Sequence, residues 1–299
     1  MIGAIIGDII GSRFEFNNHR SKEFELFDDD CEATDDSIMT LAIAKAIMET
    51  DKAKAPSDKA EVPSDKAKAP SASGFERDSD YYTLLSKMTV KYMQEIGRQY
   101  PRCGYGGSFA RWVINDDPKP YNSYGNGAAM RISPAGYTAR TEDEAIRLSE
   151  SITRVTHNHP EGIKGAEATA TAIFMARRGS TIQEIRDRID SSYYPMDFTT
   201  DEIRDTYAFN ETCQDTVPQA ITAFLESTSF EDAIRIAISI GGDSDTVAAI
   251  TGSIAEAFYG VPKDIRNKAL EYLNDDLRAI YDEWSVFAAK ENTPHKFKR

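Results

Sequence analysis

Apolar residues recur at spacings of three or four along most of the chain, and this periodicity predicts α-helices. Residues with known capping preferences bound the helical patterns: Thr141 opens a capping box, Gly179 and Gly260 follow the ends of two patterns, and Pro262 starts another. The predicted helices cover residues 37–49, 145–155, 163–178, 219–228, 233–240 and 246–259, and further helices begin at 180 and 262. Strand-like alternation is almost absent. We therefore expect an all-α fold, a compact orthogonal bundle of roughly ten or more helices, with long loops near 98–140 and 190–216.

One segment does not fit a packed domain. Residues 51–71 repeat a seven-residue unit three times, as DKAKAPS, DKAEVPS and DKAKAPS. Each copy contains a proline, which interrupts helices, and the Lys, Asp, Ala, Pro and Ser composition cannot bury a core. We expect a single domain over residues 1–299, with 51–73 as a disordered surface insertion. The insertion is interpreted as a tolerated loop expansion, with a docking tether as the alternative.

Charge and cysteine content narrow the classes of function. The 299 residues include 35 Lys and Arg against 49 Asp and Glu, so the net charge is −14, which argues against binding to nucleic acid or anionic membranes. No apolar run is long enough to span a membrane, and the apolar start of the chain lacks the basic segment of a signal peptide. The three cysteines have no metal-binding spacing, and they fit a reducing compartment. We predict a cytoplasmic protein.

Two acidic clusters precede the most apolar predicted helices, and each holds two carboxylates and a threonine: Thr34, Asp35 and Asp36, then Asp243, Asp245 and Thr246. Either cluster alone could simply cap its helix. If both helices are central, however, four carboxylates come together and repel one another unless a cation lies between them. Oxygen ligands without histidine or cysteine favour Mg²⁺, Mn²⁺ or Ca²⁺ over zinc.

Other segments carry weaker signals. The glycines of residues 7–12 allow a close approach of backbones. The segment is not a phosphate-binding P-loop, because no Gly-Lys-Ser/Thr sequence follows it. Glu15, taken alone, is interpreted as a surface acid. The glycine-rich segments 103–108 and 121–127 suit a ligand with phosphates and sugar hydroxyls, although ordinary turns would use the same residues. His157 and its neighbour His159 are more typical of a cap or turn than of a site.

Five motifs together resemble a known family. They occur in the order Gly7-Asp8-x-x-Gly11-Ser12-x-x-Glu15, Thr34-Asp35-Asp36-Ser37, Gly125-Asn126-Gly127-Ala128-Ala129-Met130-Arg131, Thr156-His157 and Gly241-Gly242-Asp243-Ser244-Asp245-Thr246. This order resembles the ADP-ribosylglycohydrolase family, which includes dinitrogenase reductase-activating glycohydrolase and the ADP-ribosyl-acceptor hydrolases. The resemblance covers nearly the whole chain except the 51–71 repeat. It implies an all-α fold with a binuclear Mg²⁺ or Mn²⁺ centre.

The resemblance also implies roles for individual residues. It implies two sets of metal ligands, the first formed by Thr34, Asp35 and Asp36 and the second by Asp243, Asp245 and Thr246. Glu15 matches an acid that approaches the metals or gates the cleft. ADP-ribose is expected at Asn122, Ser123, Tyr124, Asn126 and His157, and its diphosphate, by a looser match, at Tyr105, Gly106 and Gly107.

The implied reaction is hydrolysis at the anomeric carbon of an ADP-ribose that is attached to an acceptor. Metals would orient the ribose hydroxyls and a water, and Glu15, Asp36 or Asp245 would take the proton of that water. The expected partner is an ADP-ribosylated protein or small molecule, with an arginine or related linkage. Two alternatives stay open: a non-catalytic nucleotide-binding or structural member of the fold, and a hydrolase of another ADP-ribose compound. The sequence does not indicate an oligomeric state.

Overall fold

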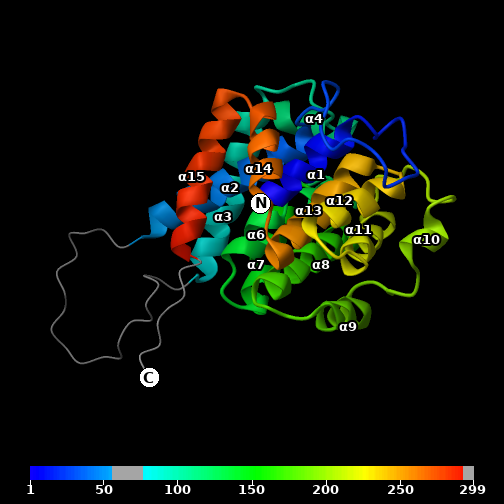
Figure 1. Ribbon diagram of the computed structural model, residues 1–299. Coiled ribbons are helices and arrows are strands. Elements are labelled where there is room, and N and C mark those ends of the chain that lie inside the picture. Colours follow the sequence, from blue (N-terminus) through cyan, green and yellow to red (C-terminus); the bar gives the residue numbers. More distant parts are fainter. Residues whose placement is uncertain (56–76, 292–299) are drawn as a thin grey trace.

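The computed structural model describes residues 1–55 and 77–291, and this part of the chain is built from helices without a strand (Figure 1). The prediction of an all-α fold is therefore confirmed. The longer helices are α1 (Ile2–Ser12), α2 (Asp35–Lys54), α3 (Ser79–Gly97), α7 (Glu142–Thr153), α8 (Pro160–Arg177), α9 (Ile182–Ser192), α11 (Val217–Leu225), α12 (Phe230–Ser239), α13 (Ser244–Tyr259) and α15 (Asp275–Glu291). No helix among the described residues is both long and apolar enough to cross a membrane.

Two helices that begin with acid pairs lie in the core, as their apolar sequences predict. Helix α13 packs against α1, α8, α11 and α12 (Figure 1). Its first three turns are buried. Helix α2 packs against α3 and α15, and it is buried from Asp36 through most of its length. The buried apolar side chains form one continuous core. The fold therefore brings the N-termini of α2 and α13 into its interior.

Helix α1 approaches α13 unusually closely because glycines line the contact. Gly3, Gly7 and Gly11 lie four residues apart, so they share one face of the helix. A Cβ atom at Gly7 would lie only 2.0 Å from the carbonyl oxygen of Ala248, and one at Gly3 would lie 2.1 Å from that of Gly252. Only a residue without a side chain fits at these positions. This close approach places Asp8 of α1 beside the N-terminal turn of α13.

The two predicted long loops contain short helices that periodicity did not indicate. Residues 98–140 include α4 (Gly107–Ile114), α5 (Gly127–Met130) and α6 (Ser133–Thr138), and residues 190–216 include α10 (Thr200–Ile203) and the 3₁₀ turn η1 (Cys213–Asp215). The chain ends with α14 (Lys263–Ala269), η2 (Leu270–Tyr272) and α15. Helices of one or two turns are too short to show a repeating apolar pattern, and their glycines are typical of loops.

The predicted start of the insertion at residue 51 is wrong. Helix α2 continues to Lys54, and Asp51 in its last turn is part of the fold. The Asp51 carboxylate accepts a hydrogen bond of 2.6 Å from the Tyr81 hydroxyl and another of 3.3 Å from Arg77 Nη2. The first four residues of the repeat therefore belong to the helix, because they extend a pattern already formed by residues 37–49. The rest of the predicted insertion, 56–73, lies outside the described residues.

Candidate functional site

A cavity of about 440 Å³ opens at the N-terminal ends of α2, α5 and α13. Most of the residues that the sequence singled out line this one cavity, although they come from segments far apart in the chain. They are Glu15, Asp35, Asp36, Gly106, Gly107, Ser123, Tyr124, Asn126, His157, Asp243, Asp245 and Thr246. Both acidic clusters and both glycine-rich segments therefore meet at one place.

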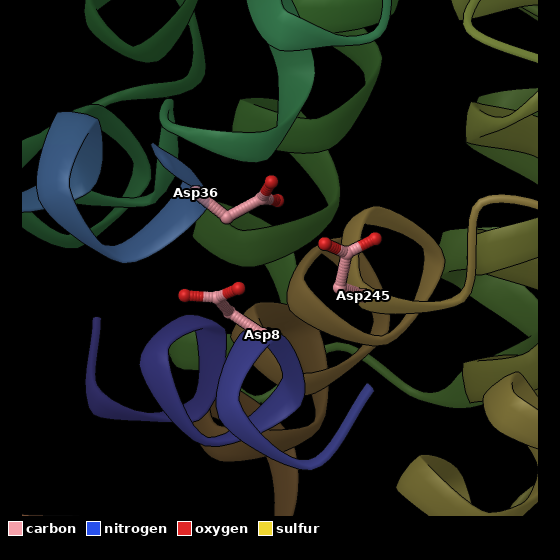
Figure 2. A group of neighbouring side chains, drawn as sticks. All are labelled: Asp8, Asp36 and Asp245. Carbon is pink, nitrogen blue, oxygen red and sulfur yellow. The ribbon is translucent and has the colours of Figure 1, made fainter. Parts of the chain in front are cut away.

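Three buried carboxylates from three helices converge beside the cavity, and two of them, Asp36 and Asp245, line it. Asp8 of α1, Asp36 of α2 and Asp245 of α13 each offer an oxygen, and these oxygens lie within 4.8 Å of one another. Figure 2 shows the three side chains turned toward the space between their helices. Burial raises the pKa of Asp8 to about 6, and it raises the pKa of Asp36 well above its usual range, with the neighbouring Asp245 charge adding to the effect.

A second group of carboxylates shares Asp245 with the first. Oxygens of Glu15, Asp243 and Asp245 also lie within 4.8 Å of one another. Glu15 follows the end of α1 and lines the cavity, so it is not the isolated surface acid that the sequence alone suggested. Burial, together with the charges of Asp245 and Asp8, raises the pKa of Glu15 to about 8. The site thus holds two adjacent clusters of three carboxylates joined by one member.

The donor set of these clusters fits hard divalent cations. Asp36 Oδ1 is buried and has no hydrogen-bond partner among the described residues, whereas its Oδ2 accepts a hydrogen bond of 3.1 Å from Thr246 Oγ1. A buried carboxylate oxygen without a partner is costly, because the charge has lost its water. All the facing atoms are oxygens, which suit Mg²⁺ or Mn²⁺ and not zinc. A cation among them would relieve both the repulsion and the lost solvation.

Asp8 also determines how α2 begins. Its carboxylate accepts hydrogen bonds from the backbone N–H groups of Thr34 at 2.9 Å and Ser37 at 3.0 Å, and also from the Thr34 hydroxyl. A side chain of another helix therefore caps α2, and the Thr34 side chain is directed toward Asp8 and not into the cavity lining. Sequence reasoning missed Asp8 as a site residue. The available signal was an aspartate in the middle of an otherwise apolar helix.

Asp35 lies at the first position of α2, where its backbone N–H donates a hydrogen bond of 2.9 Å to the carbonyl of Cys103. Gly104, which follows Cys103, has a φ of +110° and faces the Asp35 carboxylate. A Cβ atom at this position would lie 2.7 Å from Asp35 Oδ1. The glycine of the first glycine-rich segment therefore makes room for a carboxylate. This packing joins the segment 103–108 to the acidic cluster.

Asn126 connects the second glycine-rich segment to the acids. Its side-chain Nδ2 donates to Asp243 Oδ2 at 2.6 Å and to Thr216 Oγ1 at 3.2 Å. The side-chain amide holds the Asp243 carboxylate in place, and Asn126 itself lines the cavity. Asn126 was expected to bind ADP-ribose. The structure shows that it orients a candidate metal ligand.

His157 faces the cavity as a neutral ring of defined tautomer. Its Nδ1 lies 3.0 Å from Arg131 Nη2 and 2.7 Å from Thr156 Oγ1. Because an arginine nitrogen can only donate, Nδ1 must accept, and the ring proton is then on Nε2. Burial holds the pKa of His157 well below its usual range, and the Arg131 charge lowers it further. A Cβ at Gly127 would lie 3.5 Å from Nε2, so two glycines, Gly125 and Gly127, leave that N–H open to the cavity.

This geometry predicts a specific nuclear magnetic resonance signature. In protein labelled with ¹⁵N at histidine, Nε2 of His157 should carry the proton and Nδ1 should show the shift of an unprotonated ring nitrogen, without titration between about pH 6 and 8. The His157→Gln variant assigns the signal. A proton found on Nδ1 would contradict the assignment of Arg131 as the donor to this ring.

The remaining predicted residues, Tyr105 and Asn122, lie outside the cavity lining. The Tyr105 hydroxyl donates to the Gly97 carbonyl at 3.4 Å, and its ring packs edge-on against Phe109. Asn122 has a φ of 55°, and its backbone N–H donates to the Asn158 side chain at 2.7 Å. Five further lining residues belong to the two glycine-rich segments that the sequence indicated as ligand loops: Gly104, Ser108, Tyr121, Gly125 and Gly127. Sequence reasoning assigned no role to Met130 and Arg131 of the third motif, and it missed Phe109, Phe209, Glu211 and Thr212.

The fold and the site define an all-α protein whose cavity is lined by clustered carboxylates. Residues 1–295 match the ADP-ribosylglycohydrolase family, and the chain belongs to this family of glycosidic-bond hydrolases. The resemblance stated from the motifs is therefore confirmed.

Individual relatives agree with this assignment. The chain is 25% identical to the ADP-ribosylhydrolase ARH3 of Xenopus tropicalis over 327 aligned positions, which cover 87% of this chain and 86% of the relative. It is 30% identical to the ADP-ribosylarginine hydrolase Tri1 of Pseudomonas putida over 158 residues, half of this chain but only 42% of that protein. A solved structure described as an ADP-ribosylglycohydrolase-related protein complex superposes with a TM-score of 0.61 and 19% identity, over 96% of this chain and 97% of that one, which shows the shared fold.

Proposed function

We propose that this protein is a metal-dependent hydrolase that releases ADP-ribose from a modified acceptor. The ADP-ribose is attached to this acceptor by an arginine or related linkage. The bond cleaved is the glycosidic bond at the distal ribose. The observation that carries this proposal is the convergence of buried carboxylates from α1, α2 and α13, two of which, Asp36 and Asp245, line a cavity. Membership of the ADP-ribosylglycohydrolase family supports the same chemistry. The proposed substrate is an ADP-ribosylated protein or small molecule, and we expect the enzyme to act on it in the cytoplasm.

Two divalent cations, Mg²⁺ or Mn²⁺, are the proposed cofactors. Asp35, Asp36, Asp243, Asp245 and Thr246 all line the cavity and are the proposed ligands. Such ions supply Lewis acidity, which orients ribose hydroxyls and lowers the pKa of a nucleophilic water. Asp8 shares the buried cluster with Asp36 and Asp245 and adds to its negative charge. Thr34, which the family resemblance also assigns to the ligands, contributes by fixing the entry to α2.

The protein groups would then position the substrate and move one proton. Glu15, Asp36 and Asp245 are the candidate bases for the attacking water. The positive charge that develops at the anomeric carbon is stabilised by the same carboxylates. His157 donates its Nε2–H to an oxygen of the ADP-ribose, while Ser123, Tyr124 and the glycines of the two segments form the surrounding wall. A neutral histidine in this role binds the substrate and does not act as the base.

The direct test is release of free ADP-ribose from a protein ADP-ribosylated on arginine. With Mg²⁺ or Mn²⁺ present we expect turnover, which EDTA abolishes and added metal restores. A serine-linked substrate, run in parallel, separates the linkage from the reaction class. Binding of ADP-ribose without release from either substrate in any metal would favour the non-catalytic alternative.

A further inference from the structure

His159 precedes the first turn of α8, and its side chain caps that helix. The ring nitrogen Nδ1 accepts a hydrogen bond of 3.1 Å from the backbone N–H of Glu161. The structure thus shows one of the roles that the sequence suggested for this histidine. Ser, Thr, Asp and Asn are the residues that usually cap helices, and each of them would fill this role with a smaller side chain. The imidazole ring makes a second contact that a smaller cap could not make.

This second contact joins the ring of His159 to the ring of Tyr124, which lines the cavity. The two ring centroids lie 5.1 Å apart, and the ring planes are tilted by 55°. Ring pairs at this distance attract each other beyond the effect of the area that they bury. Tyr124 is 45% exposed, so the core alone does not fix its side chain. The His159 ring therefore restricts the orientations that the Tyr124 ring can adopt.

The start of α8 also supports the backbone of the segment 121–124. The N–H of Asn122 donates a hydrogen bond of 2.7 Å to the side-chain oxygen of Asn158. A Cβ atom at Gly162 would lie 2.8 Å from the carbonyl oxygen of Ser123, so α8 approaches this segment closely. The capping histidine lies between these two contacts in the sequence. A change in the first turn of α8 would therefore reach both of them.

A second segment holds the backbone of Tyr124. The N–H of Cys213 donates to the Tyr124 carbonyl at 2.9 Å, and the N–H of Asn126 donates to the Glu211 carbonyl at 2.7 Å. These bonds fix the path of the main chain and leave the side chain of Tyr124 free to rotate. The orientation of the tyrosine ring thus depends on its contact with His159.

We propose that His159 is a positioning residue for Tyr124. By capping α8 and packing against the tyrosine ring, it holds Tyr124 in the wall along which ADP-ribose binds. This inference rests on the proposed function and adds to it a residue that acts on the substrate only through another side chain. His159 lies outside the cavity lining and belongs to neither carboxylate group. Its loss should therefore weaken binding and leave the chemical step nearly unchanged.

The test uses three variants of the full chain that separate the two contacts of His159. His159→Ala removes both the cap and the ring, His159→Asn keeps a capping side chain without the ring, and His159→Phe keeps a ring without the cap. Thr181→Ala is the matched control. Thr181 caps α9 by accepting from the N–H of Glu184, and it is exposed and lies outside the cavity lining.

The first readout needs no ligand. It is the hydrogen exchange of the backbone N–H groups of Asn122 and Cys213, whose bonds hold the segment that carries Tyr124. We expect His159→Ala to speed both exchange rates about fivefold. Thr181→Ala should speed the exchange at Glu184 and leave these two rates unchanged. Unchanged exchange at both N–H groups in His159→Ala would overturn the proposal.

The second readout is affinity for ADP-ribose, together with turnover. His159→Ala should weaken ADP-ribose binding and raise KM about fivefold, with kcat within about twofold of the wild type. His159→Asn and His159→Phe should each recover part of this loss. When Tyr124→Ala is already present, His159→Ala should cause little further loss, as expected when one residue acts through the other. An equal loss with and without Tyr124, or a loss confined to kcat, would overturn the positioning role.

Failure of the proposed function would give a different result. A wild-type protein that bound no ADP-ribose and hydrolysed no linkage in any metal would contradict the proposed function. The exchange rates at Asn122 and Cys213 would still decide whether His159 supports the segment that carries Tyr124.

Discussion

Replacing Asp245 with asparagine should abolish turnover, with an expected loss of about a thousandfold or more. Asp245 is the one carboxylate common to both clusters, so its removal weakens both proposed cation positions together. The variant should nevertheless stay folded. Asparagine has nearly the same shape, and it removes one of several negative charges that repel one another in a buried site. Without metal we therefore expect Asp245→Asn to melt at a temperature equal to or above that of the wild type.

Two measurements check this expectation together: ADP-ribose release at saturating Mn²⁺, and thermal unfolding with EDTA and with Mn²⁺. Added metal should raise the melting temperature of the wild type and change that of Asp245→Asn much less, because binding to the native state stabilises it. Asp116→Asn, at an exposed position outside the cavity lining, is the control for loss of a carboxylate. Full activity of Asp245→Asn would rule out a shared carboxylate at the centre.

Sequence reasoning succeeded where local patterns report directly on burial. The helices that follow Asp35–Asp36 and Asp243–Asp245 are too apolar to lie at the surface, so their acid pairs had to be near the core. The structure places both pairs on one cavity. The glycines at 7 and 11 predicted a close backbone approach, and α1 does approach α13 closely. In each case a single segment contained the whole signal.

The remaining features depend on contacts between distant segments. Thr34 was assigned to the metal on the family motif, yet its hydroxyl donates to Asp8, a residue 26 positions earlier on another helix. Phe209 and Glu211 lie in a segment that was expected to be a loop, and no periodicity shows which of its side chains reach the cavity. Only the folded structure identifies such residues, because the residues that they contact are far from them in the sequence.

Substitution of Gly7 by alanine should reduce both stability and activity, through a contact that lies outside the cavity. Alanine favours a helix over glycine by about 1 kcal/mol, so on propensity alone the change would stabilise α1. At Gly7, however, the new Cβ would lie 2.0 Å from the Ala248 carbonyl oxygen. A backbone oxygen inside a helix cannot rotate away, so α1 and α13 must move apart. Overpacking of this kind costs about 1–3 kcal/mol or more, which exceeds the gain in propensity.

The separation matters for function because Asp8 and Asp245 lie on these two helices. Moving α1 outward would open the cluster and disturb the cap that Asp8 provides for α2. We expect Gly7→Ala to lower the melting temperature by about 2–6 °C and to bind Mn²⁺ more weakly. Gly106→Ala is the stability control, since a Cβ there meets nothing within 4 Å. A Gly7→Ala protein that melted at or above the wild-type temperature would show that α1 can move away from α13 at little cost in free energy. The close approach of the two helices would then not be what holds the carboxylates together.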